Sequence, residues 1–209
     1  VNHLFRNLGD GTFADVTRGS GVADTSYGTG CATGDADGDG DPDLFITAVG
    51  PNRLFHNAGN GRFADATAAW QVGDPRWGSS CGFLDFDRDG DLDLFVVNYV
   101  KWSTNRNIDC RRGVLRAYCT PEDYEPERDI LYRNEDDRFV DVTEALGING
   151  VGPGLGVGFA DVEWDGDTDI FVANDGRANF LYLNDSGAGF AESALQAGVR
   201  FNGHGIPEA

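Results

Sequence analysis

The chain has 209 residues, and 35 Asp and Glu residues against 16 Lys and Arg residues give it a net charge of −19. This length permits a sizeable core, and 40% hydrophobic residues argue against disorder. The charge argues against nucleic acid or an anionic membrane surface as a partner, and no apolar run approaches the roughly 18 residues of a membrane span. No Met is present, so we expect a piece of a longer protein.

A short motif, Asn-x-Leu-Phe-x-Asn, recurs four times with small changes. Its copies begin at Asn2, Asn52, Asp129 and Asn179. Each copy leads through a turn into Phe-x-Asp-x-Thr or a variant, and the marker phenylalanines, at positions 13, 63, 139 and 190, are 50, 76 and 51 residues apart. The chain is therefore an internal repeat with a unit of about 50 residues and one insertion of about 26 residues.

Each repeat unit reads as four strands. In chain order, the unit contains a run of small residues (28–34), an acidic loop, an apolar run (44–47), the repeated motif (52–57) and an alternating segment (62–67). The last two are joined by a Gly- and Asn-rich turn, because these residues accept the positive φ of a tight hairpin. Four short antiparallel strands at this spacing are typical of a propeller blade. We therefore predict an all-β chain of four-stranded antiparallel blades, with the small-residue strand innermost.

The repeats predict a single partial β-propeller domain over residues 1–209. The predicted complete blades cover residues 28–67, 78–143 and 154–194. Residues 2–17 are predicted to supply two outer strands of a first blade, and Gly203–Gly205 to begin another inner strand. The best helix candidate, Val142–Leu146, is about one turn long. A flat solenoid of sheets is the alternative architecture.

Acidic residues are concentrated in three loops, each with acidic side chains at positions 1, 3, 5, 7 and 9 and Gly at position 6. Ca²⁺ requires six or more oxygens, which alternate side chains and the position-7 carbonyl can supply, whereas without a cation the carboxylates repel one another. We predict up to three structural Ca²⁺ ions. The candidate ligands are Asp35, Asp37, Asp39, Asp41, Asp43, Asp85, Asp87, Asp89, Asp91, Asp93, Asp161, Glu163, Asp165, Asp167 and Asp169. A solvated acidic turn is the alternative, and Mg²⁺ is a poorer candidate because it dehydrates reluctantly.

These loops are not EF-hands. An EF-hand needs flanking helices and a bidentate Glu at position 12, whereas position 12 here is an apolar strand residue. The carboxylate at position 9 must therefore close each loop. The third loop has the longer Glu163 at position 3, so we expect it to bind more weakly or with shifted geometry.

The four cysteines form no Cys-x-x-Cys motif, which excludes zinc ribbons and c-type haem. Cys110 and Cys119 lie in the polar insert 100–128, where a disulfide would staple a loop without its own core. Cys31 and Cys81 occupy equivalent inner-strand positions of neighbouring blades, where they either pair or remain two small thiols. Stable disulfides and millimolar Ca²⁺ both indicate a location outside the cytoplasm.

The sequence contains no nucleophile elbow, P-loop or dinucleotide motif, so we expect no enzymatic activity and no catalytic residue. Trp77, Trp102 and Trp164 lie near loops and could line a ligand face, although Trp in a blade is more often part of the core. The histidines are scattered, and we expect packing or surface roles for them: His3, His56 and His204.

The repeat, Gly-x-Gly followed by Asp-x-Asp-x-Asp-Gly-x-x-Asp and Leu-Phe, resembles the FG-GAP/VCBS repeats of integrin-α-type propellers. The insert is similar to that of the cartilage acidic protein-like secreted family, whose bacterial members often carry an ASPIC/UnbV domain. The similar segments are Asn98–Val100, Cys110, Tyr118–Tyr124 and Asp129–Asn134. The resemblance implies a seven-bladed-type propeller, extracellular placement and structural Ca²⁺. Seven blades need about 350 residues, so we expect this chain to form about half of a ring.

We therefore expect a calcium-stabilised, secreted, periplasmic or cell-surface module for protein interaction or assembly, of the adhesion type. The insert 100–128 is the predicted docking surface for a protein partner or a neighbouring subunit. One alternative is a carbohydrate-binding or carbohydrate-cleaving propeller, because aromatic loops and Ca²⁺ suit sugars. Another is an accessory subunit of a larger cell-surface or electron-transfer complex.

Overall fold

The computed structural model describes residues 2–136 and 138–207. Strands make up 40% of the chain and helices 7%, which confirms the predicted all-β fold. The described residues form three four-stranded antiparallel sheets, each hydrogen-bonded in chain order. The first contains β3 (Tyr27–Gly34), β4 (Asp43–Val49), β5 (Arg53–Asn57) and β6 (Phe63–Asp65). The second contains β7 (Gly78–Leu84), β8 (Asp93–Asn98), β12 (Ile130–Asn134) and β13 (Phe139–Asp141), and the third β15 (Gly154–Ala160), β16 (Asp169–Asn174), β17 (Phe180–Asn184) and β18 (Phe190–Glu192).

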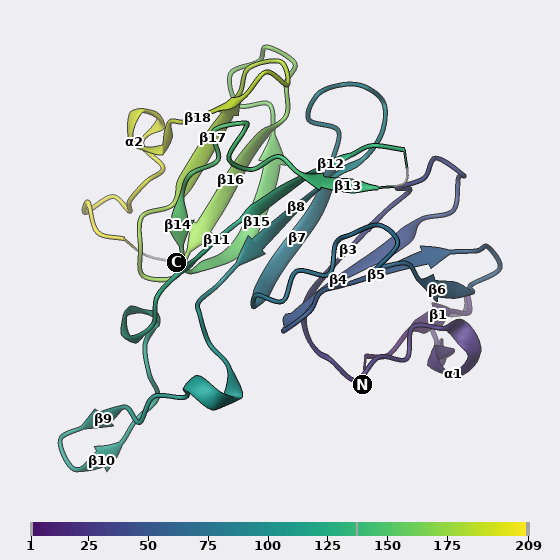
Figure 1. Cartoon of the computed structure of the whole chain (residues 1–209), viewed down its shortest axis with the longest axis horizontal. Coiled ribbons are helices and arrows are strands. Elements are labelled where there is room, and N and C mark those ends of the chain that lie inside the picture. The colour runs from purple at the N-terminus through teal and green to yellow at the C-terminus, as the bar shows by residue number, and fades with distance from the viewer. Residues whose placement is uncertain (1, 137, 208–209) are drawn as a thin grey trace.

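The three sheets lie side by side as blades, with β3, β7 and β15 innermost (Figure 1). These inner strands approach each other too closely for larger side chains. A Cβ atom on Gly30 would lie 2.9 Å from the carbonyl oxygen of Ser79, and one on Gly82 would lie 2.4 Å from the Phe159 ring. The structure thus places the small-residue strand innermost, as the sequence predicted.

Apolar side chains fill the two spaces between blades. Phe45, Leu94 and Trp70 pack between the first and second blades, and Phe86 and Tyr182 pack between the second and third. Full burial of one such side chain contributes about 1.5–3 kcal/mol. A hairpin of β1 (Phe5–Asn7) and β2 (Phe13–Asp15) precedes the first blade. Leu4 and Val22, on either side of this hairpin in the sequence, pack against the first blade in a smaller cluster.

The Phe-x-Asp-x-Thr motif joins the fourth strand of a blade to the third. Asp65 Oδ1 accepts the Thr67 N–H at 3.0 Å, and Thr67 Oγ1 accepts the Leu54 N–H at 3.0 Å. Asp141 and Thr143 repeat both contacts in the second blade. The motif recurs because these side chains pair backbone donors where the short fourth strand ends.

The insert between β8 and β12 leaves the blades at the end opposite the acidic loops, because it joins the second and third strands of its blade, whereas each acidic loop joins the first and second (Figure 1). It contains η1 (Thr104–Arg106), β9 (Arg111–Arg112), β10 (Leu115–Arg116), η2 (Pro121–Asp123) and β11 (Glu127–Arg128). Strands β9 and β10 form a hairpin that projects away from the blades, and β11 pairs with β14 (Val151–Gly152) of the next unit.

The helical and C-terminal expectations need adjustment. In the described part of the chain the α-helices are the single turns α1 (Thr17–Ser20) and α2 (Ala194–Ala197), whereas the equivalent segment around Val142–Leu146 is a hydrogen-bonded turn. Residues 202–206 also form a turn, in which the Asn202 N–H donates to the Ile206 carbonyl, where we expected the start of an inner strand. Within the described residues, no helix is long and apolar enough to cross a bilayer.

Candidate functional site

The Asp at position 9 closes each acidic loop on its own blade. Asp43, Asp93 and Asp169 are buried at the start of the second strand. In each, Oδ2 accepts the N–H of loop position 2, at 3.1, 3.1 and 2.8 Å respectively. Oδ1 accepts the N–H of the Asn that ends the repeated motif, at 2.7, 2.9 and 2.9 Å. Two backbone donors therefore hold each carboxylate in a fixed orientation.

The first loop gathers the acidic side chains of positions 1, 3 and 5. Oxygens of Asp35, Asp37 and Asp39 lie within 4.8 Å of one another. Asp35 Oδ2 accepts the Gly40 N–H at 2.9 Å, while Asp35 Oδ1 is buried without a hydrogen-bond partner. A buried carboxylate oxygen without a donor is costly, and a cation at this point would satisfy it.

The second loop gathers positions 1, 3 and 9. Oxygens of Asp85, Asp87 and Asp93 lie within 4.8 Å of one another, and Oδ1 of both Asp85 and Asp87 is buried without a partner. Burial raises the pKa of Asp93 to about 7, and the charges of Asp87 and Asp89 add to this effect. A divalent cation would offset both causes, so the residues present fit a Ca²⁺ ion.

The third loop is arranged differently. Both oxygens of Asp161 accept backbone N–H groups, from Asp165 at 3.2 Å and Gly166 at 2.9 Å. Asp167 accepts both the N–H and the hydroxyl of Ser186, at 2.8 and 2.9 Å, and forms an ion pair with Arg88 of the second loop. No three acidic oxygens of this loop lie within 4.8 Å in the described part of the chain. Outside the gathered groups lie Asp41, Asp89, Asp91, Asp161, Glu163, Asp165, Asp167 and Asp169.

A basic side chain next to position 3 was not anticipated from the sequence. His56 Nδ1 lies 3.1 Å from Asp37 Oδ2 and 3.2 Å from Asp43 Oδ1, and Arg133 Nε lies 3.1 Å from Asp87 Oδ2. Both residues precede the final Asn of the repeated motif, whose N–H binds the position-9 Asp. That shared position was the available signal, and it places the side chain beside the loop.

The final Asn of the motif also joins neighbouring blades. Asn134 Nδ2 donates to the Ala36 carbonyl of the preceding acidic loop at 2.7 Å, and Asn184 Nδ2 donates to the Phe86 carbonyl at 2.7 Å. Each Asn also bonds the acidic loop of its own blade. One amide group thus couples two acidic loops.

We expect Asn184→Ala to lower the free energy of unfolding by about 2 kcal/mol, because it leaves the buried Phe86 carbonyl without its donor. Asn57→Ala is the matched control, since Asn57 Nδ2 donates to Pro42 of its own blade and makes no bond to another blade within the described residues. Urea unfolding of both variants tests the difference. Equal losses of unfolding free energy in the two variants would show that the hydrogen bond between blades stabilises the fold no more than the bond within one blade.

The structure joins Cys110 and Cys119 in a disulfide, but it does not join Cys31 and Cys81. Cys81 packs against the core between the first two blades and accepts a hydrogen bond from the Thr47 backbone. Burial and the nearby Cys31 raise the pKa of the Cys81 thiol to about 12. The sequence left these two residues open as a pair or as separate thiols, and the structure favours separate thiols.

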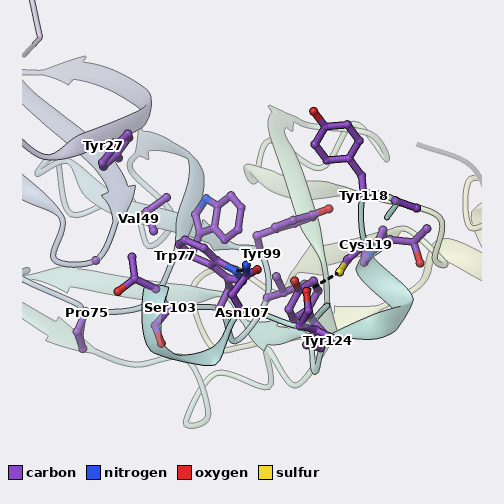
Figure 2. A pocket seen from close by; sticks show the side chains of 18 of the residues that line it. Tyr27, Val49, Pro75, Trp77, Tyr99, Ser103, Asn107, Tyr118, Cys119 and Tyr124 are labelled. Atoms are coloured by element: carbon purple, nitrogen blue, oxygen red, sulfur yellow. Dashed lines mark hydrogen bonds between the residues drawn. The ribbon is translucent and has the colours of Figure 1, made fainter. Parts of the chain in front are cut away.

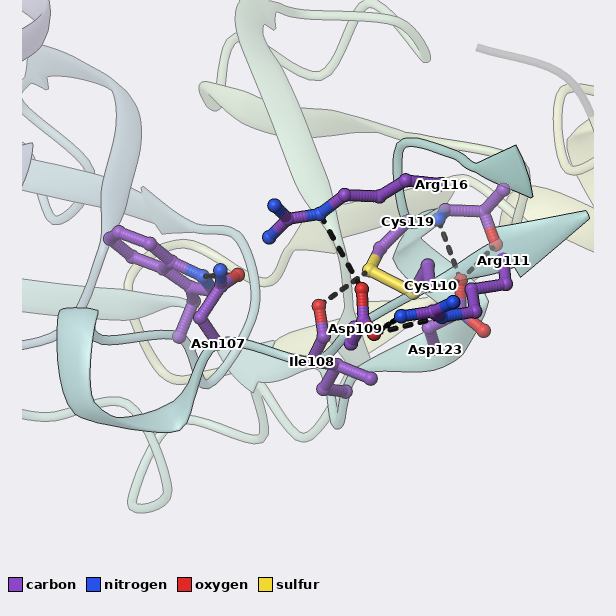
Figure 3. Close-up of a disulfide and its surroundings, with 10 residues drawn as sticks. Asn107, Ile108, Asp109, Cys110, Arg111, Arg116, Cys119 and Asp123 are labelled. Carbon is purple, nitrogen blue, oxygen red and sulfur yellow. Dashed lines mark hydrogen bonds and ion pairs between the residues drawn. A yellow bond between two sulfur atoms is a disulfide. The ribbon is translucent and has the colours of Figure 1, made fainter. Parts of the chain in front are cut away.

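The disulfide lies at the base of a projecting basic hairpin, which we call the arm (residues 109–119). Around it, Asp109 forms ion pairs with Arg111 at 2.7 Å and with Arg116 at 3.4 Å (Figure 3). Beyond it, Val114 and Leu115 are 90% and 71% exposed. The disulfide thus closes a short loop whose apolar and cationic side chains are exposed to solvent.

A large pocket of about 1,100 Å³ lies between the insert and the first two blades (Figure 2). Trp77 and Trp102 both line it, so two of the three tryptophans singled out from the sequence lie at a pocket large enough for a ligand. Trp164 lies instead on the third acidic loop, 90% exposed. The sequence pointed to these residues but not to the pocket, because the insert supplies one of its walls.

Four-stranded blades with an Asp-rich loop between the first two strands define a propeller-type repeat protein. The family model for the FG-GAP-like repeat matches residues 1–46 and 35–96, which supports an FG-GAP repeat family. No curated protein matches the chain at a significant level.

Proposed function

We propose that this chain is a calcium-stabilised, extracellular and non-enzymatic module for protein interaction or assembly. Within the FG-GAP repeats, the insert favours the cartilage acidic protein-like, ASPIC/UnbV-associated family. The observation that carries the interaction role is the arm, an exposed apolar and cationic tip on a strongly acidic chain.

The calcium part of the proposal rests on the first two acidic loops. Within each of these loops, oxygens of three acidic side chains lie within 4.8 Å of one another. Asp35, Asp85 and Asp87 each have a buried oxygen without a hydrogen-bond donor. Ca²⁺ accepts such oxygens in flexible geometry. The third loop would bind more weakly, because Asp167 already pairs with Arg88 and both oxygens of Asp161 accept backbone donors. Three ions would change the net charge from −19 to about −13.

The interaction part of the proposal rests on the composition of the arm. Exposed apolar side chains that lie together mark interaction sites, and Arg is enriched among the residues that contribute most to binding at interfaces. Arg112 has no ion-pair partner among the described residues, so its charge is available to an acidic partner. The disulfide holds the loop in one conformation, which lowers the ordering cost of binding. The disulfide is also compatible with placement outside the cytoplasm.

Replacing both Cys110 and Cys119 by Ser is expected to weaken partner binding at least about tenfold while leaving the blades folded, because the arm loses its closure but contributes no core residue. The partner is first identified by crosslinking through a photoreactive residue at position 114, and its affinity is then measured with the purified proteins. Leu195→Ser, a change at an exposed apolar residue of α2, is the control. Unchanged affinity in the double variant would refute the role of the arm.

A further inference from the structure

The pocket between the insert and the blades is open at the blade end that carries no acidic loop. Its volume of about 1,100 Å³ is slightly above the range of about 300–1,000 Å³ found for small-molecule sites. The first blade contributes Tyr27, the second contributes Trp77 and Tyr99, and the insert contributes the opposite wall. The space therefore suits an extended ligand of several units better than a single small molecule.

Aromatic rings form the floor of this pocket, and their orientation is fixed by the fold. Trp77 packs edge-on against Tyr99 at 5.0 Å and against Trp102 at 5.8 Å between ring centroids. The Tyr99 hydroxyl donates to Asp175 Oδ2 at 2.7 Å, which attaches this ring to the third blade. A ligand would meet a platform that is already ordered before binding, so little entropy is lost there.

Two further rings stand free at the ends of the pocket. Figure 2 shows Tyr27 at one end and Tyr118 at the other, with Trp77 and Tyr99 between them. Tyr27 is 81% exposed and Tyr118 is 99% exposed. Such exposure of large aromatic side chains, grouped around one hollow, marks a binding surface rather than a core.

The pocket lining is almost free of charge, although the chain is strongly acidic. Among the residues that the structure describes, no Asp or Glu lines the pocket. The charged residue that does line it, Arg116, is paired with Asp109 at 3.4 Å. The remaining polar groups are neutral hydroxyls and amides, from Ser103, Thr104 and Asn107 among others. This lining is complementary to an uncharged ligand that carries hydroxyl groups.

We propose that this pocket binds a neutral oligosaccharide. The C–H faces of sugar rings pack on aromatic rings, while sugar hydroxyls need hydrogen-bond partners such as the neutral polar side chains here. A charged peptide would find one paired arginine. The lining holds six aromatic side chains but only three branched aliphatic ones, Val49, Val100 and Ile108, which favours sugar rings over a hydrophobic peptide. The site goes beyond the protein-interaction role: residues 116–119 at the base of the arm line it, but the arm tip at Val114 and Leu115 and the acidic loops do not.

The test uses the full chain with a panel of neutral oligosaccharides, namely cello-, xylo- and mannohexaose, and with oligogalacturonate as the charged comparison. Binding is measured by calorimetry and by tryptophan fluorescence. Trp77→Ala is expected to weaken binding at least about tenfold. The matched control is Trp164→Ala, which removes an exposed Trp at the acidic end of the blades and should leave the affinity unchanged. Tyr118→Ala is a second variant that should also weaken binding. Because the Tyr118 side chain is almost fully exposed, its removal should not destabilise the fold.

The proposal is supported if a neutral oligosaccharide binds and the affinity falls in Trp77→Ala or, should that variant not fold, in Tyr118→Ala. It is overturned if no neutral member of the panel binds, or if only oligogalacturonate binds. Equal affinity of wild type and both pocket variants would also overturn it, because the ligand would then lie elsewhere on the chain.

Discussion

Chelation of Ca²⁺ is expected to lower the thermal unfolding midpoint of this chain substantially, and Mg²⁺ is not expected to restore it. A ligand that binds only the folded state stabilises it by about 3–4 kcal/mol per site at 100 to 1,000 times its dissociation constant. For a chain of this size, about 2–4 °C accompanies each kcal/mol, so each occupied loop should contribute roughly 6–16 °C. The measurement is differential scanning calorimetry with EGTA, then with excess Ca²⁺ or Mg²⁺.

The three acidic loops should contribute unequally to the Ca²⁺-dependent rise in the unfolding midpoint, and this inequality can be tested loop by loop. Asp35→Asn and Asp85→Asn each change a residue with a buried oxygen that lacks a donor, so each should remove one site. Asp161→Asn should have a smaller effect, because both oxygens of Asp161 already accept backbone N–H groups. Calorimetric titration should correspondingly show two tight sites and a weaker third. A midpoint that does not respond to EGTA would mean that these loops are solvated turns.

The blade architecture was predictable because the chain repeats itself. The spacing of the marker phenylalanines indicated the unit, and the small-residue strands indicated the innermost position, since a Cβ atom on Gly82 would meet the Phe159 ring at 2.4 Å. The small residues of one strand were therefore enough to predict that this strand lies innermost, where it contacts the neighbouring blade.

The contacts between units were not predictable from the same pattern. The bond from Asn184 to the Phe86 carbonyl joins residues 98 positions apart, and nothing local in the sequence indicates it. The approach of His56 to Asp37 depends on the side chain of one strand reaching the loop between two others. The aromatic pocket depends on where the insert folds back. All three follow from tertiary packing, and the residues involved look ordinary in isolation.

Asp129 is an exception within its own repeat, and this gives the second large expected effect. It occupies the first position of the repeated motif, where the neighbouring blades have Asn52 and Asn179. In all three blades this side chain accepts the N–H of a residue at the end of the second strand, at 2.9 Å for Asp129. Asp129 is buried, and burial raises its pKa to about 7 although the Asn98 N–H and Arg76 act in the opposite direction.

The raised pKa sets the direction of the pH dependence. Between about pH 4 and pH 7 the folded chain retains a proton on Asp129 that the unfolded chain has lost, so this group makes the free energy of unfolding fall as pH rises. A shift of about 3 units corresponds to at most about 4 kcal/mol. Asp129→Asn keeps the acceptor oxygen and removes the charge. We expect it to raise the free energy of unfolding by about 2–4 kcal/mol at pH 8 and by almost nothing at pH 4.

Urea unfolding of wild type and Asp129→Asn at pH 4, 6 and 8, in the same excess of Ca²⁺, tests this expectation. The acidic loops titrate alike in both proteins, so their contribution cancels in the difference at each pH. Asp65→Asn is the control, because Asp65 also accepts a backbone N–H but is exposed, so it should show no comparable gain at pH 8. A loss of stability in Asp129→Asn at pH 8 would mean that attraction to Arg76 outweighs the cost of burying the carboxylate. Burial of the Asp129 carboxylate is the larger effect, and its attraction to Arg76 is the smaller one because Arg76 is already paired with Asp74 at 2.9 Å.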